Sequence, residues 1–377
     1  MKVYLDNAAT TPLDEEVFEA MRPYLLDHYG NPSSTHSHGR HVRAAIESAR
    51  KTVAQLLKVT PGEIFFTSGG TEADNTLICS SIETYGLTHA ITSPIEHHAV
   101  LHTLEHQQAC GRIKLSYVEV DEHGNVNLNH LNELLQANER SLVSLMHANN
   151  EIGNLLDLEK AGEICHEHQA IFHSDTVQTM GHYAHDMNNL PLHSATAAAH
   201  KFHGPKGAGF MYIDKATKIA PYIHGGAQER NMRGGTENVY GIIGTAKALE
   251  IAYRDMEEHK RHVQELKDYM IEKLRETIDG VGFNGESANA DKSLYTVLNV
   301  CLPASSDNDM LLFTLDINGI SASGGSACSS GASKGSHVLE GIKADPERGA
   351  VRFSFSKYNT LEEINYTIAK LAEFYNK

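Results

Sequence analysis

The sequence lacks any apolar run long enough to cross a bilayer. Its start, MKVYLDNAATTP (1–12), has neither the apolar stretch nor the small-residue cleavage site of a signal peptide. Internal repeats and low-complexity linkers are also missing. We therefore expect a cytoplasmic protein that has no membrane partner.

Basic residues are outnumbered, with 32 Lys and Arg against 48 Asp and Glu and a formal net charge of −16. No basic block is present that would contact a phosphate backbone, so direct binding of nucleic acid is disfavoured. An acidic surface of this kind mostly favours solubility.

Cysteines are few and scattered: Cys79, Cys110, Cys165, Cys301 and Cys328. Their odd number and the absence of CxxC spacing argue against a disulfide framework and against a thiolate zinc site. We expect that any functional cysteine acts as a thiol.

Histidine is abundant, with 24 residues, but HExxH spacing is absent. Pairs such as His97 and His98 are more often surface or core residues than ligands, because a metal site needs several ligands in one geometry. We therefore expect no resident metal ion. A histidine-rich metal-binding or phosphate-binding protein remains an alternative of a different class.

The chain of 377 residues is long for one hydrophobic core, so two domains are expected. Short apolar runs alternate with helical patterns, which predicts an α/β fold with a mostly parallel sheet covered by helices. The runs are 63–69, 88–93, 141–149, 170–175 and 207–213. Polar or glycine residues follow the runs, and ligands bind beyond the carboxyl ends of strands in such sheets.

A second region follows a helical stretch rich in Glu and Lys that begins near residue 240. It contains a strand-like run, YTVLNVCL (295–302), and a closing helix for which Thr360 and Glu363 fit a capping box. The predicted large domain spans 13–255, and the predicted small domain combines 1–12 with 256–377.

Lys201 lies among small residues in SATAAAHKFHGPKGAG (194–209), and small residues let backbones and ligands approach closely. A surface lysine is a solvated, unreactive cation. A desolvated lysine beside another cation has a lowered pKa, and its neutral amine forms a Schiff base with an aldehyde. The confined surroundings favour the reactive interpretation.

Two groups of polar residues follow strand-like runs. In TSGGTEADN (67–75), backbone N–H groups and the Thr71 hydroxyl suit a phosphate, although Gly-Gly-Thr is also an ordinary turn. The Asp175 carboxylate suits a protonated ring nitrogen and Gln178 suits a neighbouring ring oxygen, but Asp175 is equally well explained as a helix N-cap.

His97 suits stacking on a flat ring or proton transfer, although a structural histidine is the simpler alternative. Asn150 suits donation of a hydrogen bond to an oxygen.

Cys328 lies in SASGGSACSSGASKGS (321–336), a segment of Ser, Gly and Ala. Buried structural cysteines favour apolar surroundings, so this thiol is predicted to be exposed and reactive. It is a candidate nucleophile, and an incidental surface cysteine is the alternative.

Together these segments resemble the pyridoxal-phosphate (PLP) enzymes of fold type I, in the class V aminotransferase group, and more closely the cysteine desulfurases of the NifS/IscS type. The matching motifs are YLDNAATTP (4–12), GNPSSTH (30–36), FTSGGTEADN (66–75), EHHAV (96–100), MHANNEIG (146–153), HSDTVQ (173–178), AHKFHGPKGAG (199–209), MRGGTENV (232–239), SGGSACSSG (323–331) and VRFSFSKY (351–358). The resemblance implies a large domain with a mostly parallel seven-stranded sheet and a smaller α+β C-terminal domain.

The resemblance also implies how the cofactor PLP is held. Lys201 would bind it as a Schiff base and later move protons at the substrate carbon. Asp175 would keep the pyridine nitrogen protonated, and His97 would stack on the ring and assist in acid–base steps. Gln178 and Asn150 would hydrogen-bond the phenolic oxygen.

On the phosphate side, the resemblance implies Gly70, Thr71 and His200, with Thr236 of the partner subunit of a homodimer. The third residue before the lysine is usually a serine in this family, but here it is Ala198. A phosphate hydrogen bond is therefore expected to be missing, and charge-assisted bonds contribute about 1.5–3 kcal/mol. We expect weaker retention of PLP.

The implied substrate is L-cysteine, whose carboxylate would pair with Arg352, with Asn150 beside it. The Cys328 thiolate would attack the substrate sulfur, leaving alanine and an enzyme persulfide, so the rate should fall on acidification. The segment GGSACSSGAS resembles the long-loop branch of the family, which implies direct delivery of sulfur by a swinging loop. The acceptor would be an iron–sulfur scaffold or a sulfur carrier for cluster assembly or for tRNA or cofactor thiolation, and Cys328 would meet an iron–sulfur cluster only in transit.

Three alternatives remain beside the histidine-rich binding protein: a selenocysteine lyase, another class V PLP enzyme, or a homologue that has lost activity and binds partners. The thiol of Cys328 favours sulfur removal.

Overall fold

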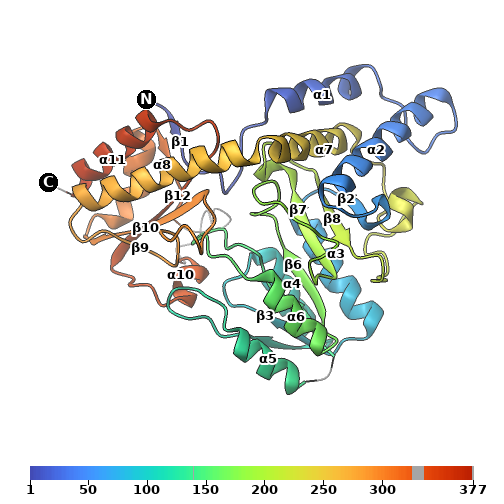
Figure 1. The fold of residues 1–377 in the computed structure, drawn as a ribbon, viewed down its shortest axis with the longest axis horizontal. Coiled ribbons are helices and arrows are strands. Elements are labelled where there is room, and N and C mark those ends of the chain that lie inside the picture. Colours follow the sequence, from blue (N-terminus) through green and yellow to red (C-terminus); the bar gives the residue numbers. More distant parts are fainter. Residues whose placement is uncertain (139, 325–334, 376–377) are drawn as a thin grey trace.

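The computed structural model describes residues 1–138, 140–324 and 335–375. Its largest sheet has seven strands: β2 (Ile64–Thr67), β3 (His89–Thr92), β4 (Lys114–Tyr117), β5 (Leu142–Ser144), β6 (Ile171–Asp175), β7 (Ser194–Ala198) and β8 (Gly209–Ile213). Their spatial order is β2-β8-β7-β6-β5-β3-β4, and neighbours are parallel except where β8 pairs with β2 and β7. The predicted mostly parallel seven-stranded sheet is confirmed (Figure 1).

The apolar runs of the sequence become strands because helices cover both faces of the sheet. The five expected runs correspond to β2, β3, β5, β6 and β8. Two strands were not predicted. β4 is short and partly exposed, and β7 consists of Ser, Ala and Thr without a large apolar side chain.

Neighbouring residues of one strand face opposite helices, as the two-residue period of a strand requires. On β6, Phe172 packs in the main core and Ile171 packs in the core under the other face. Helices of the first face are α2 (Ser37–Leu56), α5 (Leu128–Gln136), α6 (Leu158–Glu167) and α7 (Val239–Arg254), with α1 (Glu15–Leu26) packed on α7. Helices of the second face are α3 (Gly70–Tyr85) and α4 (His98–Ala109).

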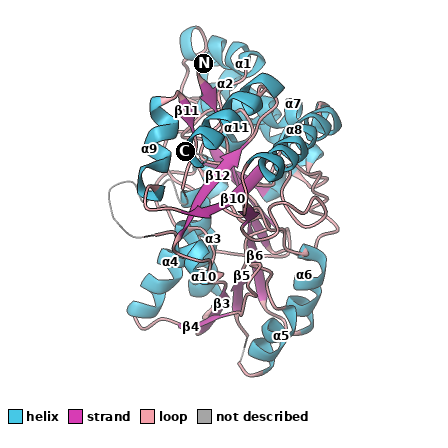
Figure 2. Cartoon of the chain, turned by 90° about the vertical axis from the view of Figure 1, so that its left-hand side faces the viewer, coloured by secondary structure: helices cyan, strands magenta, loops and turns pink. Residues whose placement is uncertain are grey.

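A second group of elements lies beside the large sheet (Figure 2). Its strands are β9 (Gly282–Phe283), β10 (Val297–Ala304) and β12 (Arg348–Ser354), all antiparallel, and the parallel pair β1 (Val3–Tyr4) and β11 (Ile320–Ser321). Its helices are α8 (Met256–Thr277), α9 (Leu311–Ile317), α10 (His337–Gly341) and α11 (Leu361–Tyr375). The predicted capping box is confirmed, since the Thr360 and Glu363 side chains each accept the other's backbone N–H.

Four 3₁₀ turns complete the described elements: η1 (Pro61–Glu63), η2 (Ala199–Lys201), η3 (Gln228–Asn231) and η4 (Asn308–Met310). None of the helices in the described ranges has the length and apolarity that crossing a membrane requires.

Two of the hydrophobic cores divide the chain in the same way as the predicted domains. One core takes buried side chains between Val17 and Ala252, and the other combines Val3 and Leu5 with side chains between Val263 and Leu371. These cores support the division near residues 12 and 255, which stays a prediction.

Candidate active site

A cavity of about 230 Å³ lies at the carboxyl edge of the large sheet. It is lined by Ala8, Ala9, Gly70, Thr71, Asp74, His97, Met146, Asn150, Asp175, Val177, Gln178, Ala198, His200, Lys201 and Arg352. Nine of these residues were candidates from the sequence: Gly70, Thr71, His97, Asn150, Asp175, Gln178, His200, Lys201 and Arg352. Parallel strands explain the convergence, because their carboxyl ends share one edge.

One candidate lies elsewhere. Thr236 lines a different hollow, together with Ser68, Gly207 and Arg233, so within one chain the structure does not bring it to the cavity. Another candidate, Cys328, lies outside the described residues.

Lys201 ends the turn η2 that directly follows β7. Its Nζ donates to the backbone carbonyls of Ala8 and Ala9, the latter at 3.0 Å. The turn is fixed from behind, since the His182 ring is 3.1 Å from the Lys201 carbonyl oxygen and Thr11 N donates to the His200 carbonyl. The amine is thus directed across the cavity towards the N-terminal segment.

Asp175 ends β6 with its carboxylate buried, and its Oδ1 accepts from Val177 N at 2.8 Å. Burial, and then the neighbouring charge of Asp74, raise the pKa of Asp175 to about 7. Burial raises the pKa of Asp74 to about 7 although a hydrogen bond with Thr196 lowers it, and its Oδ1 has no hydrogen-bond partner although His173 Nε2 lies 3.4 Å away. Two buried carboxylates with raised pKa values provide a place for a cationic ring nitrogen.

His97 is the N-cap of α4, and its Nδ1 accepts from Ala99 N at 3.1 Å. Burial and the charge of Lys201 lower the pKa of His97 to about 4, so the ring is neutral near pH 7. Because Nδ1 accepts, the ring proton is on Nε2. The ligand atoms of Asp74, His97 and Asp175 lie within 4.8 Å of one another, a grouping of acids and imidazole that also suits an aromatic cation.

The start of α3 has the form of an anion site. No side chain caps the helix, and its N-cap, Gly69, has φ of 150°, a conformation that favours glycine. A Cβ on Gly70 would lie only 2.9 Å from Val177 Cγ2, so this position has no room for a side chain. Open backbone N–H groups at a helix N-terminus are suited to a phosphate.

Ala198 faces this anion site, since its Cβ lies 3.7 Å from a Cβ placed on Gly70. The hydroxyl of Thr196 does not take over the role of the missing serine, because its Oγ1 lies 3.2 Å from His173 Nε2. On the other side, His200 Nδ1 is 3.2 Å from Thr10 Oγ1, and burial followed by the charge of Lys201 lowers the pKa of His200 to about 4. The phosphate side therefore has one hydroxyl fewer than the family pattern.

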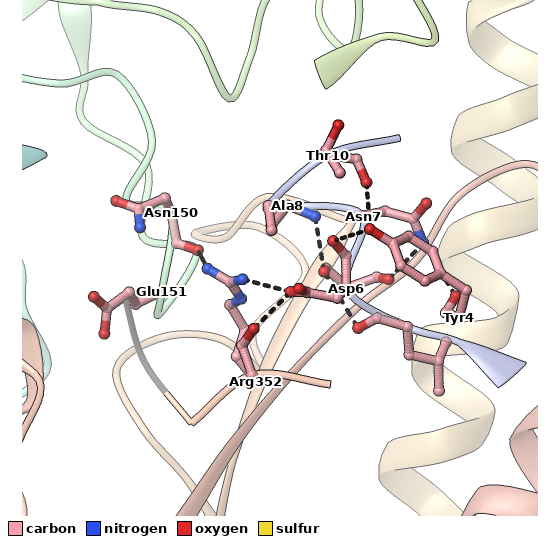
Figure 3. Close-up of polar contacts among 12 residues, drawn as sticks. Tyr4, Asp6, Asn7, Ala8, Thr10, Asn150, Glu151 and Arg352 are labelled. Atoms are coloured by element: carbon pink, nitrogen blue, oxygen red, sulfur yellow. Dashed lines mark hydrogen bonds and ion pairs between the residues drawn. The ribbon is translucent and has the colours of Figure 1, made fainter. Parts of the chain in front are cut away.

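Arg352 belongs to β12 and is 1% exposed. Its Nη2 lies 2.7 Å from Asp6 Oδ1, and its Nη1 donates to the Asn150 carbonyl at 2.9 Å, as Figure 3 shows. Its Nε is buried without a hydrogen-bond partner. This guanidinium can still donate hydrogen bonds to a second carboxylate.

The sequence did not identify the roles of Asp6, Ala8, Ala9 and Asp74. Ala8 and Ala9 act through backbone carbonyls, which no side-chain pattern reveals. Asp74 belongs to a segment that was interpreted only as a phosphate turn. The motif YLDNAATTP contributed to the resemblance to the family, but it did not predict that these residues contact Lys201 or Arg352.

The family model of class V aminotransferases matches residues 3–367. A cysteine desulfurase IscS of Dictyoglomus turgidum (strain DSM 6724 / Z-1310) is 43% identical over 381 residues, covering 100% of this chain and 95% of that protein. Among solved structures, a NifS-like protein is 38% identical with a TM-score of 0.91, and 99% of each chain is covered. SspA in complex with cysteine is 29% identical with a TM-score of 0.82, covering 95% of this chain and 100% of that one.

PLP, the cofactor of this family, is a flat ring with a phosphate arm and a basic nitrogen. Its parts match the open helix terminus at Gly70, the buried acid Asp175 and the confined amine Lys201. Sequence, fold and cavity agree, and the chain belongs to the class V aminotransferase family, as a full-length relative of the PLP-dependent cysteine desulfurases.

Proposed function

We propose that the protein is a PLP-dependent cysteine desulfurase that converts L-cysteine to L-alanine and carries the sulfur as a persulfide on Cys328. The observation that carries this proposal is the convergence of Lys201, Asp175 and Arg352 on one cavity. An amine, a buried acid and a buried guanidinium are the three groups that a cofactor-bound amino acid requires.

The residues that would hold PLP follow from the cavity. Lys201 would bind it covalently, Asp175 would face its ring nitrogen, and His97 would lie against its ring. Gln178 and Asn150 are available for the phenolic oxygen. Gln178 is already oriented, because its Nε2 donates to the Ala8 carbonyl at 3.1 Å.

The N–H groups at Gly70 and Thr71 and the His200 side chain would hold the phosphate, and Thr236 of the partner subunit would complete the site. The position of Thr236 away from the cavity supports a contribution to a second subunit. Exposed apolar side chains on and after α1 support a subunit contact: Phe18 is 44% exposed, Leu26 65% and Tyr29 76%.

When bound, PLP withdraws electrons from the substrate carbon. Arg352 binds the substrate carboxylate through its remaining N–H groups and so orients the amino acid. Lys201 takes the proton from the α-carbon and returns a proton to it. Neutral His97, with its proton on Nε2, is suited to donate or accept a proton beside the ring.

Sulfur transfer takes place at Cys328, which lies outside the described residues. Its thiolate attacks the substrate sulfur, an S–S bond forms and the substrate C–S bond breaks. In sum, cysteine and an enzyme thiol give alanine and an enzyme persulfide, so no external oxidant or reductant is needed. Sulfur then passes to an acceptor protein, for which we propose an iron–sulfur scaffold or a sulfur carrier.

The test begins with the visible absorbance of the lysine-bound cofactor in the purified protein. L-Cysteine is then added, and sulfide and alanine are measured for the wild type, Lys201→Ala and Cys328→Ala. We expect both products from the wild type, no specific visible band in Lys201→Ala, and the band without sulfide release in Cys328→Ala. A protein that cannot be loaded with PLP would contradict the proposal.

The same assay separates the alternatives. A higher kcat/KM for L-selenocysteine than for L-cysteine would favour a selenocysteine lyase. A coloured protein that releases neither sulfide nor alanine would favour a partner-binding homologue. The cytoplasmic location stays a prediction from the sequence.

A further inference from the structure

The N-terminal turn Tyr4–Thr10 is fixed on β12 by contacts that span almost the whole chain. Ala8 N donates to Ser354 Oγ and Asn7 Nδ2 donates to the Ser354 carbonyl, both at 2.8 Å. The Tyr4 hydroxyl closes the turn by donating to the Thr10 carbonyl at 2.8 Å. Figure 3 shows this compact turn beside Arg352.

Asp6 is the residue of this turn that reaches the guanidinium. Its Oδ1 lies 2.7 Å from Arg352 Nη2 and also accepts from the Ser323 hydroxyl at 2.8 Å. Ser323 is itself bound to Arg352 through the backbone, since Arg352 N donates to the Ser323 carbonyl at 2.6 Å. Asp6 is thus held in place while it holds the arginine.

The guanidinium is fixed from two sides. Asp6 binds Nη2, and the Asn150 carbonyl binds Nη1, so the planar group cannot rotate without losing one of these bonds. A guanidinium has five N–H donors, and these contacts leave the second N–H groups of Nη1 and Nη2 for a second carboxylate, since Arg352 lines the cavity while its Nε is buried. Asp6 and a substrate carboxylate can therefore bind Arg352 at the same time.

The charge of Asp6 also makes the burial of Arg352 tolerable. An uncompensated buried cation is strongly unfavourable, and the exposed fraction of the Arg352 side chain is 2%. Because its charge is compensated and its orientation is set, Arg352 is ordered before a substrate binds. Binding therefore costs less conformational entropy of the Arg352 side chain.

We propose that Asp6 is a positioning residue for the substrate α-carboxylate, that it acts through Arg352, and that it thereby sets the preference for amino acids with a free carboxylate. This inference rests on the proposed desulfurase function. The proposed role of Asp6 is to place Arg352, and it requires no contact between Asp6 and the cofactor.

The experiment compares L-cysteine with its methyl ester, which lacks the carboxylate charge, in PLP-loaded wild type and Asp6→Ala. We expect kcat/KM for L-cysteine to fall about tenfold in Asp6→Ala, mainly through KM, with little change for the ester. Asp6→Asn should recover only part of the loss, because an amide oxygen can still accept from Arg352 and Ser323 but does not compensate the guanidinium charge. Ser323→Ala should show a smaller loss in the same direction.

A readout independent of turnover is the binding of L-alanine by isothermal titration calorimetry, which should weaken by a similar factor in Asp6→Ala. Asp316→Ala, an exposed acid on α9, is the matched control and should behave as wild type. Equal losses for cysteine and its ester, or alanine binding unchanged in Asp6→Ala and Asp6→Asn, would overturn the inference. An inactive wild type would instead refute the proposed function.

Discussion

At position 198, the wall of the cavity presents a methyl group where the family usually has a hydroxyl. We predict that Ala198→Ser tightens the binding of PLP, because Ala198 faces the helix terminus at Gly70 and the Thr196 hydroxyl is directed to His173. A charge-assisted hydrogen bond contributes about 1.5–3 kcal/mol, so the dissociation constant should fall about tenfold or more. Equilibrium dialysis of PLP against the apoprotein measures it.

The control is Ala198→Gly, which removes the methyl group without adding a donor. It should bind PLP no more tightly than wild type. If Ala198→Ser binds PLP with wild-type affinity, another group already satisfies the phosphate and the expected weak retention is wrong.

Lys267 is a buried amine far from the cavity residues in sequence, with its Nζ donating to Ser293 Oγ and the Leu294 carbonyl. Burial lowers its pKa from 10.5 to about 7. Between about pH 7 and 10 the unfolded chain binds a proton at this residue and the folded chain does not. Stability from this residue therefore rises with pH, by up to about 1.4 kcal/mol per unit.

We predict that Lys267→Met removes this slope. Urea unfolding at pH 7, 8 and 9 should show the free energy of unfolding of the wild type rising relative to that of Lys267→Met. Lys51→Met, at an exposed position of α2, should keep the wild-type slope. Parallel pH profiles for the wild type and Lys267→Met would mean that the lysine remains charged when folded.

The residues that the sequence predicted correctly as neighbours share one property. Asp175 ends a strand, Lys201 and His97 each follow one, and the parallel order of these strands brings them to one edge. Asp6 could not be found in this way. It is brought to Arg352 by the pairing of β1 with β11 and by bonds to β12, which join distant parts of the chain.

At the scale of elements, the turn η3 contains three successive non-glycine residues with positive φ. Glu229, Arg230 and Asn231 have φ values of 42°, 57° and 66°, which side-chain-bearing residues rarely adopt in succession. A buried ion pair holds the turn in place, with Glu229 2.7 Å from Arg50 and also accepting from Phe66 N.

We predict that Glu229→Gln destabilises the protein by about 3–5 kcal/mol, because it removes the buried carboxylate that compensates the buried Arg50 charge. The matched control is Glu47→Gln, which removes a second carboxylate from the same arginine but at a 48% exposed side chain. That change should cost less than about 1 kcal/mol. Thermal unfolding of both variants distinguishes the buried partner from the exposed one, and equal shifts would contradict the assignment.

The strands were predictable where their apolar residues were continuous. β6 is fully buried, and its run of apolar residues before Asp175 marked it. β7 was not predicted because it packs between helices through Ala and Thr side chains. Close packing of such small side chains leaves no hydrophobic pattern in the sequence. Both the lysine and the residue at position 198 are positioned by this unpredicted strand.

For the whole molecule we predict a homodimer in which Thr236 serves the neighbouring subunit. Multi-angle light scattering should give twice the mass of one chain, and a monomeric mass for the active protein would contradict the prediction. Mixing Lys201→Ala chains with Thr236→Ala chains tests whether Thr236 contributes to the site of its own subunit or to that of its partner.

In the mixed dimer, one site would combine an intact Lys201 with Thr236 of the partner subunit. That site should bind PLP with wild-type affinity, while each variant alone should not. If Thr236 served its own subunit, the mixed dimer would contain no intact site, and PLP affinity would not recover. Mixed dimers of Lys201→Ala with wild type are the control for subunit exchange.

The ion pair between Asp6 and Arg352 joins residues 346 positions apart, and the Lys201 amine contacts the same N-terminal turn. During synthesis, the turn is made long before β12, the strand that holds it. The large sheet can form before β12 exists, whereas Asp6 and Arg352 come together only after β12 has been made. A chain interrupted before β12 lacks the Arg352 guanidinium, so we expect that it cannot hold the carboxylate of an amino acid.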